Sequence, residues 1–176
     1  MTTFEQVFSF PNPVNEVAAR CVAAAVAITG TVAIAAGLPW LSALLAAGFL
    51  LRVASGPTLS PLGQVATRVV APRIGRPKLV PGPPKRFAQA IGAVVTVTAT
   101  ITYFALGLTP VTYALLGVLV LAATAESVFA LCLGCQVFAL LMRLGLVPVE
   151  VCVACNSLPS PNAQARLRGT GAARDS

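Results

Sequence analysis

Two long stretches of this chain carry no charged side chain, and they constrain its fold more than any other feature. One runs from Cys21 to Leu51 and the other from Phe87 to Ala125. Only 10% of the 176 residues are charged and 57% are apolar, whereas soluble domains contain about 25% charged residues. Lipid must therefore solvate much of the surface, and the sequence predicts an all-α integral membrane protein.

Each uncharged stretch can hold two helices, because each contains a turn signal near its middle. These signals are Gly37-Leu38-Pro39 and the segment from Gly107 to Pro110. We therefore predict a four-transmembrane-helix bundle within a membrane domain of residues 1–155. The expected helix ranges are 17–36, 40–54, 87–106 and 111–142.

The fourth predicted helix is too long for one membrane span. At about 1.5 Å per residue it would measure about 48 Å, and the hydrocarbon core is about 30 Å thick. The helix must either protrude from the bilayer or break near Gly134. The sequence leaves both arrangements open.

The segment from Gly56 to Arg86 joins the two halves and is rich in basic residues and proline, with no acidic residue. Proline at this density prevents a continuous helix, although Leu62 to Val70 can form a short amphipathic helix at the membrane surface. Basic loops stay in the cytoplasm, so we expect a cytoplasmic loop and both termini cytoplasmic in a multi-pass cell-membrane protein. Nucleic-acid binding is not expected, because the loop lacks interleaved aromatic residues.

The two ends of the chain differ in composition. Residues 156–176 consist largely of Pro, Ser, Ala, Gly and Arg, which predicts a disordered cytoplasmic tail. The first 16 residues have no basic side chain, so we expect no secretory signal there. Asn15 is expected to cap the first helix, and Glu16 to pair with Arg20 one turn later.

Two CxxC pairs are the strongest local signal. They are Cys132 with Cys135 and Cys152 with Cys155, and sixteen residues separate the pairs. This spacing matches a tetrathiolate zinc pattern, so one hypothesis is a Zn or Fe-S site made by all four cysteines. The aliphatic residues between the pairs argue against a zinc ribbon. Cys21 is interpreted as a small apolar side chain that fills space in the first helix.

The second hypothesis for the CxxC pairs is thiol redox or sulfur-transfer chemistry. Such sites place the attacking thiol at a helix N-terminus or beside a cation, where its pKa falls. Cys132 is expected within an apolar helix, where burial and the helix dipole would raise the pKa of its thiol. Glu150 would likewise oppose thiolate formation at Cys152. These positions are a difficulty for the redox hypothesis.

Glu126 is a candidate site residue because it follows an uncharged run. An intramembrane carboxylate is costly and often handles ions or protons. It could equally pack inward in its protonated form and bond to a neighbouring group. A small transporter centred on Glu126 is therefore a further alternative.

The absence of His removes the commonest acid-base group and metal ligand, and five acidic residues make paired-carboxylate catalysis improbable.

Several segments in order resemble the domain-of-unknown-function 4395 family of small bacterial membrane proteins. They are Phe10–Glu16 with Arg20, Gly56–Leu62, Gly82–Gln89, Ala125–Ser127 and the two CxxC pairs. Members of that family are often encoded beside thioredoxin-like and sulfurtransferase proteins, so the resemblance implies a thiol- or sulfur-handling role. It implies no mechanism and assigns no residue a function. Residues that match the family pattern include Asn15, Glu16, Arg20, Lys85, Arg86, Glu126 and the four paired cysteines.

The leading hypothesis is a membrane-anchored thiol-redox or sulfur-relay component with Cys132, Cys135, Cys152 and Cys155 at the cytoplasmic face. The expected partners are the lipid bilayer and a soluble thioredoxin-like or rhodanese-like carrier. Substrate, oligomeric state and enzymatic status do not follow from the sequence.

Overall fold

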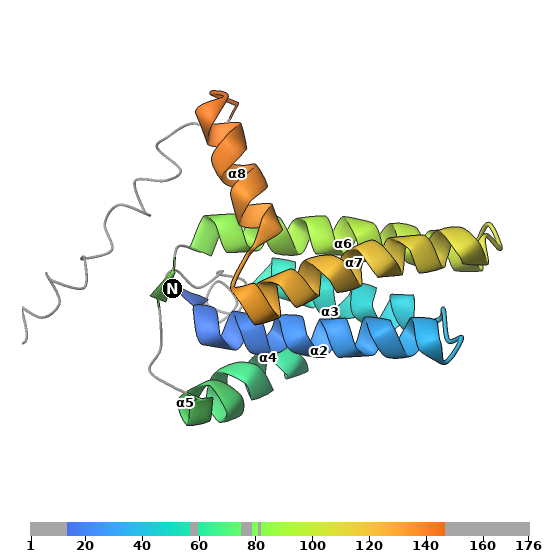
Figure 1. The fold of residues 1–176 in the computed structure, drawn as a ribbon, viewed down its shortest axis with the longest axis horizontal. Coiled ribbons are helices and arrows are strands. Elements are labelled where there is room, and N and C mark those ends of the chain that lie inside the picture. Colours follow the sequence, from blue (N-terminus) through green and yellow to red (C-terminus); the bar gives the residue numbers. More distant parts are fainter. Residues whose placement is uncertain (1–13, 57–59, 75–78, 81, 147–176) are drawn as a thin grey trace, which may run out of the picture.

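A computed structural model describes residues 14–56, 60–74, 79–80 and 82–146 of the chain. Its fold is almost entirely helical (Figure 1). The tail predicted at residues 156–176 lies outside the described residues, as do Cys152 and Cys155.

Three helices are long and apolar enough to cross a membrane, which supports the membrane class predicted from composition. They are α2 (Glu16–Ala35), α6 (Gly82–Phe104) and α7 (Thr109–Phe129). A fourth apolar helix, α3 (Leu41–Ser55), has 15 residues, which is below the usual lower limit of about 17 for a span. Large side chains on these helices are open to the surroundings, such as Leu121 at 74% and Val94 at 66% exposure. Lipid is the solvent that such a surface requires.

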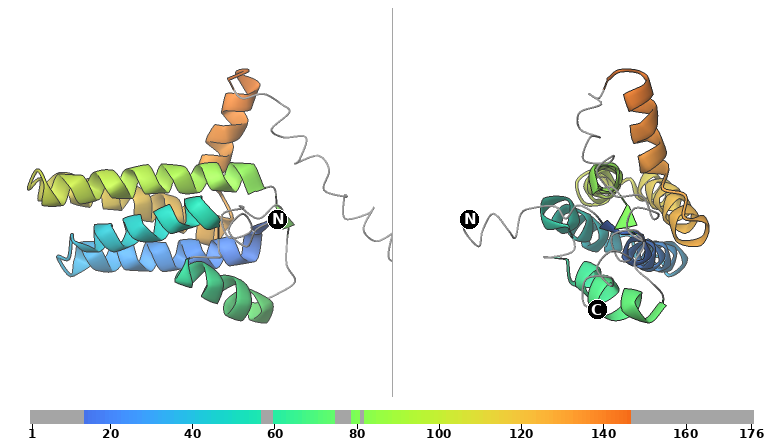
Figure 2. Two further views of the ribbon diagram at one scale, coloured as in Figure 1. Left: turned by 180° about the vertical axis from the view of Figure 1, so that it is seen from behind. Right: turned by 90° about the vertical axis from the view of Figure 1, so that its left-hand side faces the viewer.

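The three long helices and α3 lie side by side, with α2 against α7, α3 against α6, and α6 against α7 (Figures 1 and 2). Two glycines permit the close approach of neighbours. A Cβ at Gly30 would stand 2.6 Å from Val120 Cγ2, and one at Gly92 would overlap the Phe49 ring. The core between the helices is formed by Val26, Ala33, Leu45, Phe49, Ala93, Leu116, Leu119 and Ala123.

Both turns that the sequence signals form at the same end of the bundle (Figure 1). Gly37 and Gly107 adopt left-handed φ angles of 67° and 65°, a conformation that glycine tolerates without steric cost. Pro110 lies in the first turn of α7, where no backbone N–H is needed. Beside the second turn, the buried hydroxyls of Thr102 and Thr112 lie 3.0 Å apart and connect α6 to α7.

The opposite end of the bundle gathers the polar connections. β1 (Val14–Asn15) pairs antiparallel with β2 (Leu79–Val80). The side chain of Asn15 accepts a hydrogen bond from Val17 N at 3.0 Å and caps α2 as predicted. α6 begins at Gly82, earlier than the predicted start at Phe87, because Pro83 and Pro84 fit the first turn of a helix.

The basic connection contains a helical segment made of α4 (Pro61–Val65), η1 (Ala66–Val70) and α5 (Ala71–Ile74). It is longer than the amphipathic helix expected at Leu62 to Val70. Its buried residues Ala66 and Ala71 pack with Ala18 of α2. The segment therefore packs against α2, and it also exposes apolar side chains such as that of Val65.

Of the two arrangements left open for the helix expected at 111–142, the structure shows the broken one. α7 ends at Phe129, and a separate helix α8 (Leu133–Arg143) leaves the bundle crosswise (Figures 1 and 2). The break lies at Ala130 to Cys132, before Gly134. The contact between α8 and α6 favours this crosswise direction.

Candidate functional site

The break between α7 and α8 puts Cys132 at a helix N-terminus. Ala130 adopts a left-handed φ of 56°, and Leu131 N donates to Ala125 O at 3.2 Å, which closes the end of α7. Cys132 is the N-cap residue of α8, with Gln136 N donating to its carbonyl at 3.1 Å. The interpretation of Cys132 as lying within an apolar helix is therefore corrected. A helix N-terminus favours a thiolate.

The two cysteines of this pair have different environments. Cys132 is buried and Cys135, in the first turn of α8, is half-buried. A hydrogen bond from Cys135 lowers the pKa of the Cys132 thiol, and the positive charge of Lys85 lowers it further, against the opposing effects of burial and of Glu126. The same hydrogen bond, together with burial, raises the pKa of Cys135. The two thiols of the pair therefore differ: the pKa of Cys132 is lowered and that of Cys135 is raised.

Contacts with α6 hold α8 and its first turn in place. A Cβ at Gly134 would stand 2.5 Å from Ala88 Cα, so the two backbones touch at this point. Further along α8, the Phe138 ring lies 5.5 Å from the Phe87 ring at 56°. These two contacts determine where Cys132 lies relative to the bundle.

Glu126 forms an ion pair with Lys85. Lys85 Nζ and Glu126 Oε1 are 2.6 Å apart, and the two side chains are 9% and 21% exposed. The pair joins the start of α6 to the end of α7. Charge neutralisation by Lys85 explains how a carboxylate is tolerated in this position.

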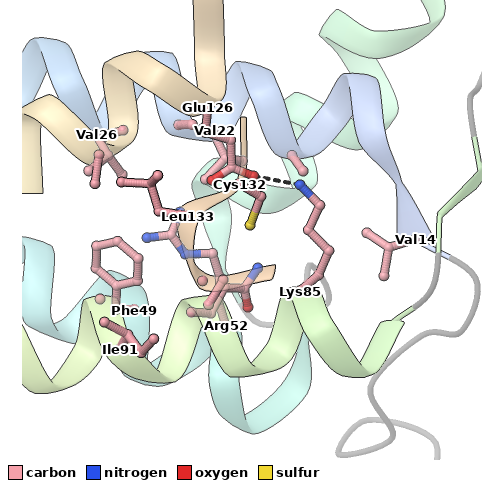
Figure 3. A pocket seen from close by; sticks show the side chains of 18 of the residues that line it. Val14, Val22, Val26, Phe49, Arg52, Lys85, Ile91, Glu126, Cys132 and Leu133 are labelled. Carbon is pink, nitrogen blue, oxygen red and sulfur yellow. Dashed lines mark hydrogen bonds and ion pairs between the residues drawn. The ribbon is translucent and has the colours of Figure 1, made fainter. Parts of the chain in front are cut away.

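These groups border a cavity of about 430 Å³ at the same end of the bundle. Cys132, Lys85, Glu126 and Arg52 all line it, and Figure 3 shows their side chains directed into the same space. Arg52 is only 3% exposed. Its Nε donates to Gly48 O at 3.0 Å, and its guanidinium lies 4.4 Å from the Phe49 ring centre. The remaining wall is mainly aliphatic.

Arg20 supports the site from α2. Its guanidinium donates to Ser127 O at 3.1 and 2.9 Å and to Val128 O at 3.2 Å. These carbonyls are at the end of α7, where the helix leaves acceptors without an internal partner. A cation at this position also complements the helix dipole. Arg20 thus secures the last turn of α7 immediately before the break.

The structure brings together three of the candidate residues from the sequence. Glu126 and Cys132 line one cavity, and Cys135 is a hydrogen-bond partner of Cys132. In the part of the chain that is described, no group of three or more His, Cys, Asp or Glu could hold a metal ion. The tetrathiolate hypothesis requires Cys152 and Cys155 as well, so it stays a prediction.

Sequence reasoning did not assign Lys85 and Arg52 to this site. A buried carboxylate needs a cationic partner, and Lys85 and Arg86 are the first charges before the uncharged run that leads to Glu126. That signal could have suggested Lys85. In the sequence, Arg52 is a charged residue near the end of an apolar helix, which gives no sign of burial. Only the tertiary structure shows that its guanidinium is buried.

The region that matches a known protein family has nearly the same bounds as the described helical fold. The model of the family described as Domain of unknown function (DUF4395) matches residues 14–143. The chain belongs to this DUF4395 family. The matched region begins with β1 and ends with the last residue of α8, so it contains Cys132, Lys85 and Glu126 and excludes Cys152 and Cys155. No curated protein and no solved structure matches the chain.

Proposed function

We propose that this DUF4395 protein is a membrane-embedded thiol-redox component in which Cys132 is the attacking thiol and Cys135 the resolving thiol. The observation that carries the proposal is the position of Cys132 at the N-terminus of α8, beside the Lys85–Glu126 ion pair. Helix N-termini and nearby cations are the two features that activate cysteine in dithiol oxidoreductases. Both act on Cys132.

The proposed exchange proceeds in two steps. The Cys132 thiolate attacks a partner's disulfide, forms a mixed disulfide and releases one partner thiolate, which takes up a proton. Cys135 then loses its proton and attacks Cys132, forming the Cys132–Cys135 disulfide and releasing the second partner thiol. The partner gains two electrons and the CxxC pair loses two. A sulfur-relay role would use the same Cys132 thiolate to accept sulfane sulfur as a persulfide.

The proposed orientation has four transmembrane helices with the cavity end in the cytoplasm. Six of the seven described basic residues lie at this end, near the starts of α2 and α6, at the end of α3 and on the α4–α5 segment. They are Arg20, Arg52, Arg68, Arg73, Lys85 and Arg86, and the seventh, Arg143, ends α8. The two turns at the other end, around Gly37 and Gly107, carry no charge. This asymmetry favours a cytoplasmic basic loop and cytoplasmic termini.

A soluble thioredoxin-like or rhodanese-like carrier is the proposed partner. The α4–α5 segment presents Arg68 and Arg73 at the surface, and the Cys132–Cys135 pair lies at the same end of the bundle. Cytoplasmic thiols are kept reduced, so a disulfide in this pair would be transient. The ion pair with Lys85 accounts for Glu126 without a transported ion, which favours thiol chemistry over the transporter hypothesis.

Trapping of a mixed disulfide tests this proposal. In the full-length protein, Cys135→Ser should accumulate a covalent adduct with an added thioredoxin-like protein, visible on a non-reducing gel and lost on reduction. Cys132→Ser should form none, and Cys21→Ser serves as the matched control that should behave as wild type. An adduct that survives Cys132→Ser would contradict the assigned role. The double variant Cys152→Ser/Cys155→Ser tests whether the second pair takes part.

A further inference from the structure

Arg52 has hydrogen-bonding capacity that the described residues do not satisfy. Arg52 is only 3% exposed, and it lines the cavity. Its Nε is bonded to Gly48 O, but within the described ranges its two terminal nitrogens have no hydrogen-bond acceptor. A buried guanidinium without acceptors is costly. The cavity therefore offers strong donors to an oxygen atom of a bound molecule.

Gln89 presents the complementary group. It lies on α6 one turn after Lys85 and lines the same cavity, and its buried Oε1 has no hydrogen-bond donor among the described residues. Arg52 and Gln89 thus supply an unused donor and an unused acceptor. A molecule with both carbonyl and hydroxyl oxygens would satisfy them.

The rest of the cavity selects an apolar molecule. Val26, Phe49 and Leu119 form part of its wall and belong to the hydrophobic core. Ile91 of α6 and Val118 of α7 also line it, although they are 39% and 59% exposed. The cavity thus reaches the lipid-facing surface of α6 and α7. A volume of about 430 Å³ is typical of small-molecule sites, which span about 300–1,000 Å³.

From these features we infer that the cavity binds the ring of a lipid-soluble quinone, with Arg52 donating to a ring oxygen and the apolar tail directed into the bilayer. This inference rests on the proposed thiol-redox function and names a membrane electron acceptor for the Cys132–Cys135 pair. The pair is reduced again when the exchange with the carrier runs in reverse: a carrier dithiol reduces the Cys132–Cys135 disulfide and leaves as a disulfide. Oxidation of the two thiols forms one S–S bond and releases two electrons and two protons. The quinone takes up both, and its two carbonyl oxygens become the hydroxyls of the quinol. The Gln89 amide oxygen can accept from a quinol hydroxyl.

Photolabelling with an azido-quinone tests the binding site separately from the chemistry. The full-length Cys132→Ser/Cys135→Ser variant, in lipid vesicles, should be labelled on peptides of α6 or α7, and decylubiquinone should compete with the label. Loss of a charged hydrogen bond in Arg52→Gln should weaken labelling by about tenfold. The exposed Arg68 gives the matched control Arg68→Gln, which should label normally.

A cavity-filling variant keeps the test decisive if Arg52→Gln does not fold. Ala122 lines the cavity and Ala114 lies exposed on the same helix outside it. Ala122→Leu should reduce labelling strongly, whereas Ala114→Leu should not. Equal labelling of both leucine variants, or a label that decylubiquinone does not displace, would overturn the quinone site.

Anaerobic mixing of the reduced wild-type protein with decylubiquinone then measures the redox step. We expect one quinol formed for each Cys132–Cys135 disulfide. If thioredoxin adducts form but decylubiquinone does not compete with the photolabel, the proposed thiol exchange is supported and the quinone inference is overturned. Competed labelling in a protein whose cysteines neither reduce the quinone nor form adducts would support the binding site and overturn the proposed function.

Discussion

Gly134 of α8 lies directly on Ala88 of α6, so closely that a Cβ on the glycine would stand 2.5 Å from both the Cα and the Cβ of the alanine. Gly134 separates the two cysteines of the CxxC pair. The contact therefore places the first turn of α8, with Cys132, against the helix that carries Lys85. Gly134, in the middle of the CxxC motif, therefore has a packing role in addition to the proposed thiol chemistry of the motif.

Gly134→Ala should separate α8 from α6. Overpacking of this kind costs about 1–3 kcal/mol, because the nearest neighbour atoms include the backbone of Ala88, which cannot rotate away. We expect a lower thermal stability and altered alkylation of Cys132. Gly117→Ala on α7 is the matched control, since a Cβ there meets nothing within 4 Å. Equal behaviour of the two variants would show that the helix contact is not close.

At position 130, glycine should give a more stable fold than alanine or any larger residue. The φ of 56° at Ala130 is left-handed, a conformation that costs an L-residue about 1–2 kcal/mol. Ala130→Gly removes that cost and should be neutral or slightly stabilising. Ala130→Val should destabilise, because β-branched residues tolerate this region poorly. Thermal melting of both variants checks the order, and a stable Val variant would indicate that α7 continues without a break.

Lys85 and Glu126 should depend on each other for stability. Removing one member of a buried ion pair leaves the other without compensation and costs about 3–5 kcal/mol. We expect about 2 kcal/mol here, since both side chains retain some exposure. Unfolding of Lys85→Met, Glu126→Gln and the double variant in detergent measures the coupling. The double variant should lose less than the sum of the single losses, and strict additivity would argue against the pair.

Alkylation of Cys132 should reach half its maximal rate at a lower pH than alkylation of an ordinary exposed thiol, because the pKa of Cys132 is lowered. The pKa of Cys132 is lowered chiefly by the hydrogen bond from Cys135, so Cys135→Ala should move the midpoint to higher pH. Lys85→Met should raise the midpoint as well, whereas Glu126→Gln should lower it, because the carboxylate opposes ionisation. Iodoacetamide rates between pH 5 and 10 test these directions. A midpoint that all three variants leave unchanged would disprove the electrostatic coupling.

The same shift has a consequence for stability. Since the pKa of Cys132 is lower in the folded protein than in an unfolded chain, ionisation stabilises the fold fully above the unfolded pKa. That contribution is lost as the pH falls through the folded pKa. Cys132→Ser should remove this part of the pH dependence of unfolding, and a Cys132→Ser variant with the wild-type dependence would contradict the shift.

Several features of the fold follow from the sequence because they depend on local chemistry. Uncharged runs mark the apolar helices, since charge burial in lipid is costly wherever it occurs along a chain. Gly37 and Gly107 mark turns because their backbone conformations favour glycine. Asn15 caps α2 through a bond to a residue only two positions away. The family resemblance likewise depends on the order of short segments.

The candidate site was decided by contacts between distant parts of the chain. Lys85 meets Glu126 across 41 positions, and no local pattern specifies that pairing. Apolar residues continue on both sides of Ala130, so hydropathy alone cannot show where α7 ends. The packing of Gly134 on Ala88 and the hydrogen bonds of Arg20 to the end of α7 favour the break. Sequence by itself therefore determined a membrane protein with a CxxC pair, and the tertiary structure decided that Cys132 begins a helix beside a buried ion pair, because only folding brings these groups together.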